Sequence, residues 1–158
     1  MYRPQFAYPT PDGFVDEDFD HYYDNLSVPL LGGMKTQEVR NIPLQLDTDA
    51  DFLWRGIKIP SADANTPPNI GIQLRAPDGR YIMAGYVPIW LFGLQLSQNP
   101  NYNGPGSILE PEIYCPRGST ILLNLFDFNN SNDALEVITL TGVKRWSKEQ
   151  CCGEACYA

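Results

Sequence analysis

Residues 70–83 read IGIQLRAPDGRYIM, and this stretch decides the fold class. Its first six residues place isoleucine or leucine at every second position, which is the alternation of a β-strand with one buried face. The Pro77-Asp-Gly-Arg80 segment is typical of a tight turn, because proline presets φ and glycine tolerates positive φ. A second strand over residues 81–83 then completes a predicted hairpin.

Further short strands are predicted on both sides of this hairpin. They cover residues 42–46, 52–59, 86–94, 108–114, 120–128 and 136–146. Fourteen prolines and thirteen glycines favour turns over long helices. About eight strands, with no helix longer than about two turns, predict an all-β chain folded as a β-sandwich, plausibly of the jelly-roll type.

The beginning of the chain has a different composition and is predicted to be an extended, irregular arm. It shows neither a helical nor a strict strand period, and its prolines favour an extended path. Because so many rings are unlikely to stay in water, either the chain's own domain or a neighbouring subunit must cover them, and both alternatives stay open. The predicted partner-binding residues are these rings: Tyr2, Phe6, Tyr8, Phe14, Phe19, Tyr22 and Tyr23.

The sequence therefore divides into three parts. Residues 1–38 are the predicted arm, residues 39–146 the β-sandwich domain, and residues 147–158 a short cysteine-containing tail. The 158 residues suffice for one domain with its own hydrophobic core.

The charge of the chain argues against two classes of partner. A formal net charge of −8 and a pI near 4.4 disfavour nucleic acid and anionic membranes, both of which need basic protein surface. No apolar run approaches the roughly 20 residues that span a bilayer, and the N-terminal residues lack the apolar stretch of a secretory signal. We expect synthesis in a cytoplasm, with no nucleic-acid or membrane partner.

The cysteines are the first residues that could form a metal site or disulfides. The four thiols are Cys115, Cys151, Cys152 and Cys156. A tetrahedral zinc site is disfavoured because the paired C-x2-C spacing is absent. Disulfides, within or between subunits, and free thiols remain as alternatives.

The run Asp47-Thr-Asp-Ala-Asp51 resembles the beginning of a calcium-binding loop. Such a loop needs glycine at its sixth position and glutamate at its twelfth, where this chain has Phe52 and Lys58. We therefore expect these acids to face water in a connecting loop and to bind no metal.

The sequence offers few of the residue combinations that catalysis requires. The only histidine, His21, lies in the predicted arm, which is an unsuitable place for a nucleophile–histidine pair. Glu110 and Glu112 flank Pro111 and would share a strand face, which is the minimum for glycoside hydrolysis, but such pairs are common. No glycine-rich phosphate loop is present. We expect no enzymatic activity and no cofactor.

Several segments together resemble small virion proteins of tailed bacteriophages. They are the arm followed by IPLQLDTDADFLWRGIKI, GIQLRAPDGRYI, GYVPIWL and LEPEIYCPRGS, and the likeness covers residues 1–146 but not the cysteine tail. It implies a head-associated β-sandwich of the jelly-roll cement or decoration type, made in the host cytoplasm and held on the capsid surface. The implied partner is the major capsid protein or another virion protein, the implied state is a homo-oligomer, and no catalytic residue carries over.

Two further functions stay open. One is a head–tail connector, neck or tail-fibre attachment protein of the same virion. The other is a carbohydrate-binding β-sandwich, in which exposed rings would stack against sugars. Its candidate rings are Tyr81, Tyr86, Trp90 and Tyr102.

Overall fold

A computed structural model describes residues 7–28, 38–59, 69–92, 107–128 and 134–147. Nine β-strands and one 3-10 turn make up its regular structure, and the described residues contain no α-helix. The strands are β1 (Ala7–Pro9), β2 (Phe14–Val28), β3 (Glu38–Gln45), β4 (Asp51–Lys58), β5 (Ile70–Arg75), β6 (Val87–Pro88), β7 (Ser107–Cys115), β8 (Thr120–Asp127) and β9 (Ala134–Ser147). The 3-10 turn covers Ile89–Phe92.

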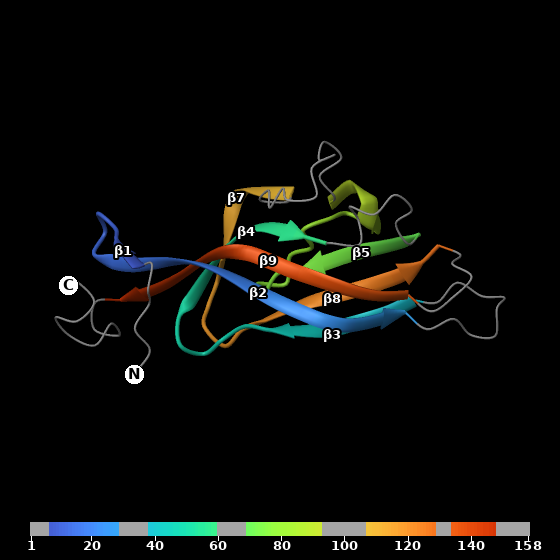
Figure 1. The fold of residues 1–158 in the computed structure, drawn as a ribbon, viewed down its shortest axis with the longest axis horizontal. Helices are drawn as coiled ribbons and strands as arrows, with labels where there is room; N and C mark the ends of the chain where they lie inside the picture. The colour runs from blue at the N-terminus through green and yellow to red at the C-terminus, as the bar shows by residue number, and fades with distance from the viewer. Residues whose placement is uncertain (1–6, 29–37, 60–68, 93–106, 129–133, 148–158) are drawn as a thin grey trace.

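The strands form two antiparallel sheets. The five-stranded sheet has the order β1-β2-β9-β4-β7, and the four-stranded sheet has the order β3-β8-β5-β6. Figure 1 shows the long strands β2 and β9 running side by side along the molecule, with β3 and β8 also alongside each other. The prediction of an all-β sandwich is confirmed.

The core lies between the inner faces of the two sheets. Ile70, Ile72 and Leu74 are fully buried, as their alternation predicts. Burying each such side chain contributes about 1.5–3 kcal/mol. The same cluster includes Leu44, Phe52, Trp54, Ile57, Ile121, Leu123, Leu125, Ile138 and Leu140.

The predicted turn after β5 is also present. The Gly79 amide donates to the Ala76 carbonyl over 2.9 Å, and Gly79 has a φ of 89°. The expected strand at residues 81–83 is reduced to a single bridge between Arg75 and Tyr81, and the next pairing with β5 is made by β6.

The prediction of an irregular N-terminal arm is wrong for residues 7–28. Residues 7–9 and 14–28 form β1 and β2, and β2 pairs with β9 from Phe14 opposite Ser147 to Val28 opposite Ala134. A tight turn with Gly13 at a φ of 82° joins the two strands. This part of the chain therefore belongs to the sandwich itself, which begins well before residue 39.

The reason for this error lies in which residues occupy the inner positions of β2. Its inner face carries Val15, Phe19 and Tyr23, but also His21 and the buried Glu17. A histidine and a glutamate at inward positions interrupt the apolar alternation that marks a half-buried strand. Residues 1–6 and 29–37 of the predicted arm lie outside the described residues.

Strand β7 departs from the sheet near its middle. Ile113 pairs with Trp54 and Ile108 pairs with Gly56, so residues 109–112 lie opposite Arg55 alone. Proline has no amide proton for the ladder, and Pro111 stands in this segment. Figure 1 shows the sharp bend of β7 that results. We call residues 109–112 the β7 bulge.

Candidate functional site

Three exposed aromatic side chains of β1 and β2 lie on the outer face of the five-stranded sheet. Tyr8, Phe14 and Tyr22 are 41%, 37% and 63% exposed. Tyr8 pairs with Asp16, and Phe14, Asp16 and Tyr22 occupy alternate positions of β2, so all of them point away from the core. Tyr8 and Phe14 lie near the beginning of β2, and Tyr22 lies eight residues further along it, about 26 Å from Phe14 at 3.3 Å per residue. We call the outer face marked by these three rings the aromatic surface.

An ion pair fixes one end of the aromatic surface. The Arg145 Nε and Nη2 atoms donate to the two carboxylate oxygens of Asp16, each over 2.7 Å. The Arg145 guanidinium also lies 5.2 Å from the centre of the Phe14 ring, and Asp16 is buried beneath these groups. A two-pronged pair of this kind is rigid, so Phe14 is held in place before any partner arrives.

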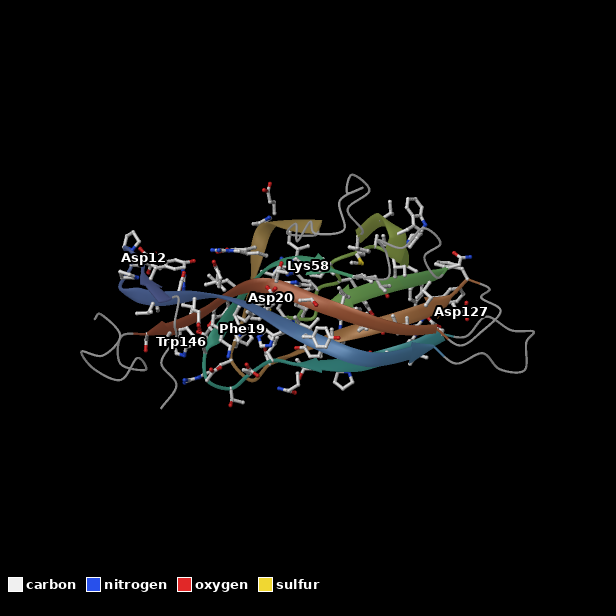
Figure 2. All side chains as sticks on the ribbon, in the orientation of Figure 1. Asp12, Phe19, Asp20, Lys58, Asp127 and Trp146 are labelled. Atoms are coloured by element: carbon white, nitrogen blue, oxygen red, sulfur yellow. The ribbon has the colours of Figure 1, made fainter. Side chains whose placement is uncertain are left out.

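Charged side chains line the same face beyond the ion pair. Asp18 and Asp20 are exposed and alternate with the inward residues of β2. Lys58 of β4 reaches Asp20 with a 3.9 Å separation between Nζ and Oδ2, and Figure 2 shows the two residues close together on the sheet. Exposed pairs of this kind contribute little to stability, so their charges remain available to a partner.

Two of the predicted partner-binding rings point inward instead. The Phe19 ring lies 4.0 Å from the Lys144 Nζ atom. The Tyr23 hydroxyl donates to the Gln45 carbonyl over 2.9 Å, and burial raises the pKa of Tyr23. Phe19 and Tyr23 therefore support the fold and do not join the aromatic surface. Tyr2 and Phe6 lie outside the described residues.

The acidic run at residues 47–51 begins in the loop between β3 and β4 with Asp47 and Asp49 exposed, as expected, and its carboxylates also contact neighbouring side chains. The buried Lys144 Nζ atom contacts Asp47 over 2.7 Å and Asp49 over 3.0 Å. Asp51 accepts a hydrogen bond from the Tyr114 hydroxyl over 2.9 Å. The hydrogen bond from Lys144 lowers the pKa of Asp47. Within the described segments, no group of three or more His, Cys, Asp or Glu side chains is arranged to hold a metal ion.

His21 sits in this buried neighbourhood. Its ring contacts Phe52 and Phe19 edge to face, with ring centres 4.6 Å and 4.9 Å apart. Burial lowers the pKa of His21 below its ordinary value, and the negative charge of Asp47 only partly opposes this effect. His21 therefore stays neutral in the folded protein at pH values where a free histidine would be protonated.

We expect this histidine to make the fold sensitive to mild acid. As pH falls below about 6.5, His21 binds a proton in the unfolded chain more readily than in the folded protein. The free energy of unfolding therefore decreases. The phenylalanine variant His21→Phe keeps the ring packing and should show a smaller decrease. Urea unfolding of both proteins at about pH 7.5 and about pH 5 checks this. Equal decreases in the two proteins would contradict it.

Cys115 behaves as an apolar core residue. It is fully buried, takes part in no disulfide, and burial raises the pKa of its thiol to about 12. A thiol of this kind is a poor nucleophile and a poor metal ligand. The predicted thiol or disulfide residues Cys151, Cys152 and Cys156 lie outside the described residues.

A groove runs between the β7 bulge and the turn after β5. Its larger hollow has a volume of about 390 Å³ and is lined by Arg80, Tyr81, Ile82, Leu109, Glu110, Pro111, Glu112 and Ile113. A second hollow of about 290 Å³ is lined by Pro77, Asp78, Arg80, Tyr114 and Pro116. Because Arg80 lines both hollows, we treat them as one groove, the β7 groove. The structure thus brings Glu110 and Glu112 to one site, as their spacing predicts.

The remaining rings proposed for sugar binding are placed differently. Tyr81 is 52% exposed in the β7 groove, and Trp90 is 43% exposed on the 3-10 turn. Tyr86 donates its hydroxyl hydrogen to Glu38, and its ring centre lies 5.2 Å from that of Phe126. Burial raises the pKa of Tyr86 to about 12, so this residue has a structural role. Tyr102 lies outside the described residues.

No protein family, curated protein or solved structure matches this chain at a significant level. None of the described segments forms a helix with the length and apolar character needed to cross a membrane.

Sequence reasoning missed the charged partners of the aromatic surface and of the acidic run at residues 47–51. Asp16 and Arg145 are far apart in the chain, as are Asp47 and Lys144, and they meet only because β2 and β4 both pair with β9. No local spacing reveals such contacts. The register of β9 could have revealed them, because it decides whether Lys144 or Arg145 points inward.

Proposed function

We propose that this protein is a non-enzymatic structural protein of a tailed-phage virion that binds and stabilises the capsid lattice as a cement or decoration protein. The observation that carries the proposal is the preorganised aromatic surface on an all-β sandwich. Its partner is the major capsid protein or another virion protein, and its copies associate according to the local symmetry of the capsid.

The strand order supports the fold that this proposal implies. If strands β2 to β9 are lettered B to I, the two sheets read B-I-D-G and C-H-E-F. With β1 as an added edge strand, this order supports a jelly-roll architecture, which viral capsid proteins and lectins use. The resemblance of residues 1–146 to head-associated virion proteins points in the same direction.

The aromatic surface supports contact with a folded protein. Tyrosine, phenylalanine and arginine are enriched in protein interfaces, and tyrosine and arginine often dominate the binding energy. Because the Asp16–Arg145 pair already fixes Phe14, binding loses less side-chain entropy. The exposed Asp18 and Asp20 beside the rings favour a partner with an apolar pocket and a basic rim.

Stabilisation of the lattice follows from the position of such a protein. A capsid expands or breaks only when contacts between neighbouring subunits are lost. A protein that binds across a subunit boundary adds buried surface that must also be lost. The acidic exterior helps particles to stay dispersed.

Co-sedimentation with purified capsids tests the proposal. The wild-type protein should pellet with the capsids at a saturating ratio, and Tyr22→Ser should weaken binding by about tenfold or more, since removing an aromatic hot-spot residue costs about 2 kcal/mol or more. Trp90→Ser is the matched control, because Trp90 is also an exposed ring but lies on the 3-10 turn beside the four-stranded sheet.

Three results would count against this assignment. One is wild-type protein that stays in the supernatant, and another is a Tyr22→Ser variant that binds as tightly as Trp90→Ser. Binding to isolated head–tail connectors, with none to the capsid shell, would instead assign the protein to the neck of the virion.

A further inference from the structure

The β7 groove holds an exposed aromatic ring on a rigid hairpin. The Ile82 amide donates to the Leu74 carbonyl over 2.9 Å, and the Ala76 amide donates to the Arg80 carbonyl over 2.8 Å. These bonds close the turn on both sides of Tyr81. The Arg75 guanidinium lies 5.9 Å from the centre of the Tyr81 ring and supports it. Half of the ring is nevertheless exposed, so a ligand can stack on it without a rearrangement of the turn.

Polar groups on the same rim are also held in place. The Arg80 Nε atom donates to Asp78 over 2.6 Å, and the Arg80 amide donates to the other oxygen of that carboxylate over 3.0 Å. On the opposite wall, Arg55 donates to Glu112 over 2.7 Å. Arg80, Glu110 and Glu112 are all exposed, so their remaining donor and acceptor positions can reach a ligand.

The floor of the β7 groove is apolar. Ile82, Leu109 and Ile113 are half-buried between the two rims. The larger hollow therefore combines an aromatic ring, an apolar floor, one guanidinium and two carboxylates. At about 390 Å³, this hollow is within the size range of small-ligand sites.

We propose that the β7 groove binds a neutral oligosaccharide. A sugar ring has an apolar face of C–H groups, which stacks on Tyr81, and hydroxyl groups at its edge, which both donate and accept hydrogen bonds. The carboxylates of Glu110 and Glu112 accept from these hydroxyls, and the Arg80 guanidinium donates to them. The second hollow, which shares Arg80, continues the groove for the next sugar unit.

The charges in the groove select among ligands. The larger hollow has two carboxylates against one exposed guanidinium and the second hollow adds Asp78, so the groove repels phosphate, sulfate and carboxylate groups, and anionic glycans and nucleic acids bind weakly. A basic peptide is the rival ligand that charge alone would allow. The flat ring of Tyr81 favours the sugar, because a sugar places its face of C–H groups on the ring while its hydroxyl groups reach the polar rim. The lining of the groove includes none of Tyr8, Phe14 and Tyr22, so variants of different residues test glycan binding and capsid binding.

An array of immobilised neutral oligosaccharides, made from glucose, galactose, mannose and N-acetylglucosamine, provides the test. Heparin and a lysine-rich peptide are included as the anionic and basic alternatives. The full-length protein should bind at least one neutral glycan with a Kd of about 1 mM or tighter. Tyr81→Ala should weaken that binding by about tenfold, whereas Tyr22→Ser, which removes an exposed tyrosine of the aromatic surface, should leave it unchanged.

A change of charge separates the two ligand classes. Glu110→Gln keeps a planar hydrogen-bonding group but loses the stronger charged acceptor, so it should weaken binding of a neutral glycan by roughly threefold to tenfold, and binding of a basic peptide by more than that. Three outcomes would overturn the inference: no neutral glycan bound on the array, glycan binding that survives Tyr81→Ala, or binding of the peptide alone. Capsid co-sedimentation of Tyr81→Ala should equal that of the wild-type protein, so the failure of one proposal leaves the other standing.

Discussion

Removal of residues 1–28 is expected to abolish the cooperative folding of this protein. The deletion takes away β2, which pairs with β9 along nearly its whole length and contributes the buried Val15 and His21 to the inner face. Strand β9 would become an edge, and the fully buried Ile138 and Leu140 would lose their cover on one side. Each exposed side chain of this kind costs about 1.5–3 kcal/mol, against a typical total stability of about 5–15 kcal/mol.

Thermal unfolding followed by circular dichroism measures this effect. A shorter deletion, of residues 1–13, is the matched control, because it removes β1 and its turn but leaves β2 intact. We expect a cooperative transition for the shorter deletion and none for the longer one. A chain that still unfolds cooperatively without residues 1–28 would show that β2 is dispensable, which is what an independent arm would predict.

Replacement of Gly142 by alanine is expected to have the second largest effect. An added Cβ atom at this position would lie 2.1 Å from the Leu53 carbonyl oxygen and 2.8 Å from the Phe52 ring. The clash with the carbonyl involves the backbone of β4, so a change of side-chain rotamer cannot relieve it. Overpacking in a core typically costs 1–3 kcal/mol, and the backbone clash places Gly142→Ala at about 3 kcal/mol or more.

Urea denaturation of Gly142→Ala and Gly85→Ala provides the comparison. An alanine at position 85 would meet no atom within 4 Å, so its effect should stay within about 0.5 kcal/mol. If Gly142→Ala were as stable as Gly85→Ala, the close packing of β9 against β4 would be contradicted.

The features that sequence reasoning predicted are local ones. Alternation within residues 70–75, the turn at residues 77–80 and the interruption of β7 at Pro111 each depend on neighbouring residues alone. Side-chain direction in a strand and the φ preferences of proline and glycine suffice to explain them.

The features that sequence reasoning missed depend on contacts between residues that are distant in the chain. Lys144 can be buried only because Asp47 and Asp49 reach it, and His21 can face inward only because Phe19 and Phe52 pack around it. A buried charge without partners is very costly, so the sequence pattern alone favoured an irregular arm over a strand with an inward face.

Sequence reasoning named the aromatic residues of the candidate site but not the directions in which their side chains point. Sequence reasoning singled out the aromatic residues of the predicted arm, yet only a strand register decides which face each one occupies. That register places Tyr22 outside and Tyr23 inside, although the two are adjacent in the chain.

Co-sedimentation with capsids tests the central claim most directly, because it asks whether the aromatic surface binds the particle. We predict that the wild-type protein and Trp90→Ser pellet with capsids at the same saturating ratio, whereas Tyr22→Ser requires about tenfold more protein to reach it. Wild-type protein that remains in the supernatant, or a Tyr22→Ser variant that saturates capsids as readily as Trp90→Ser, would contradict the account.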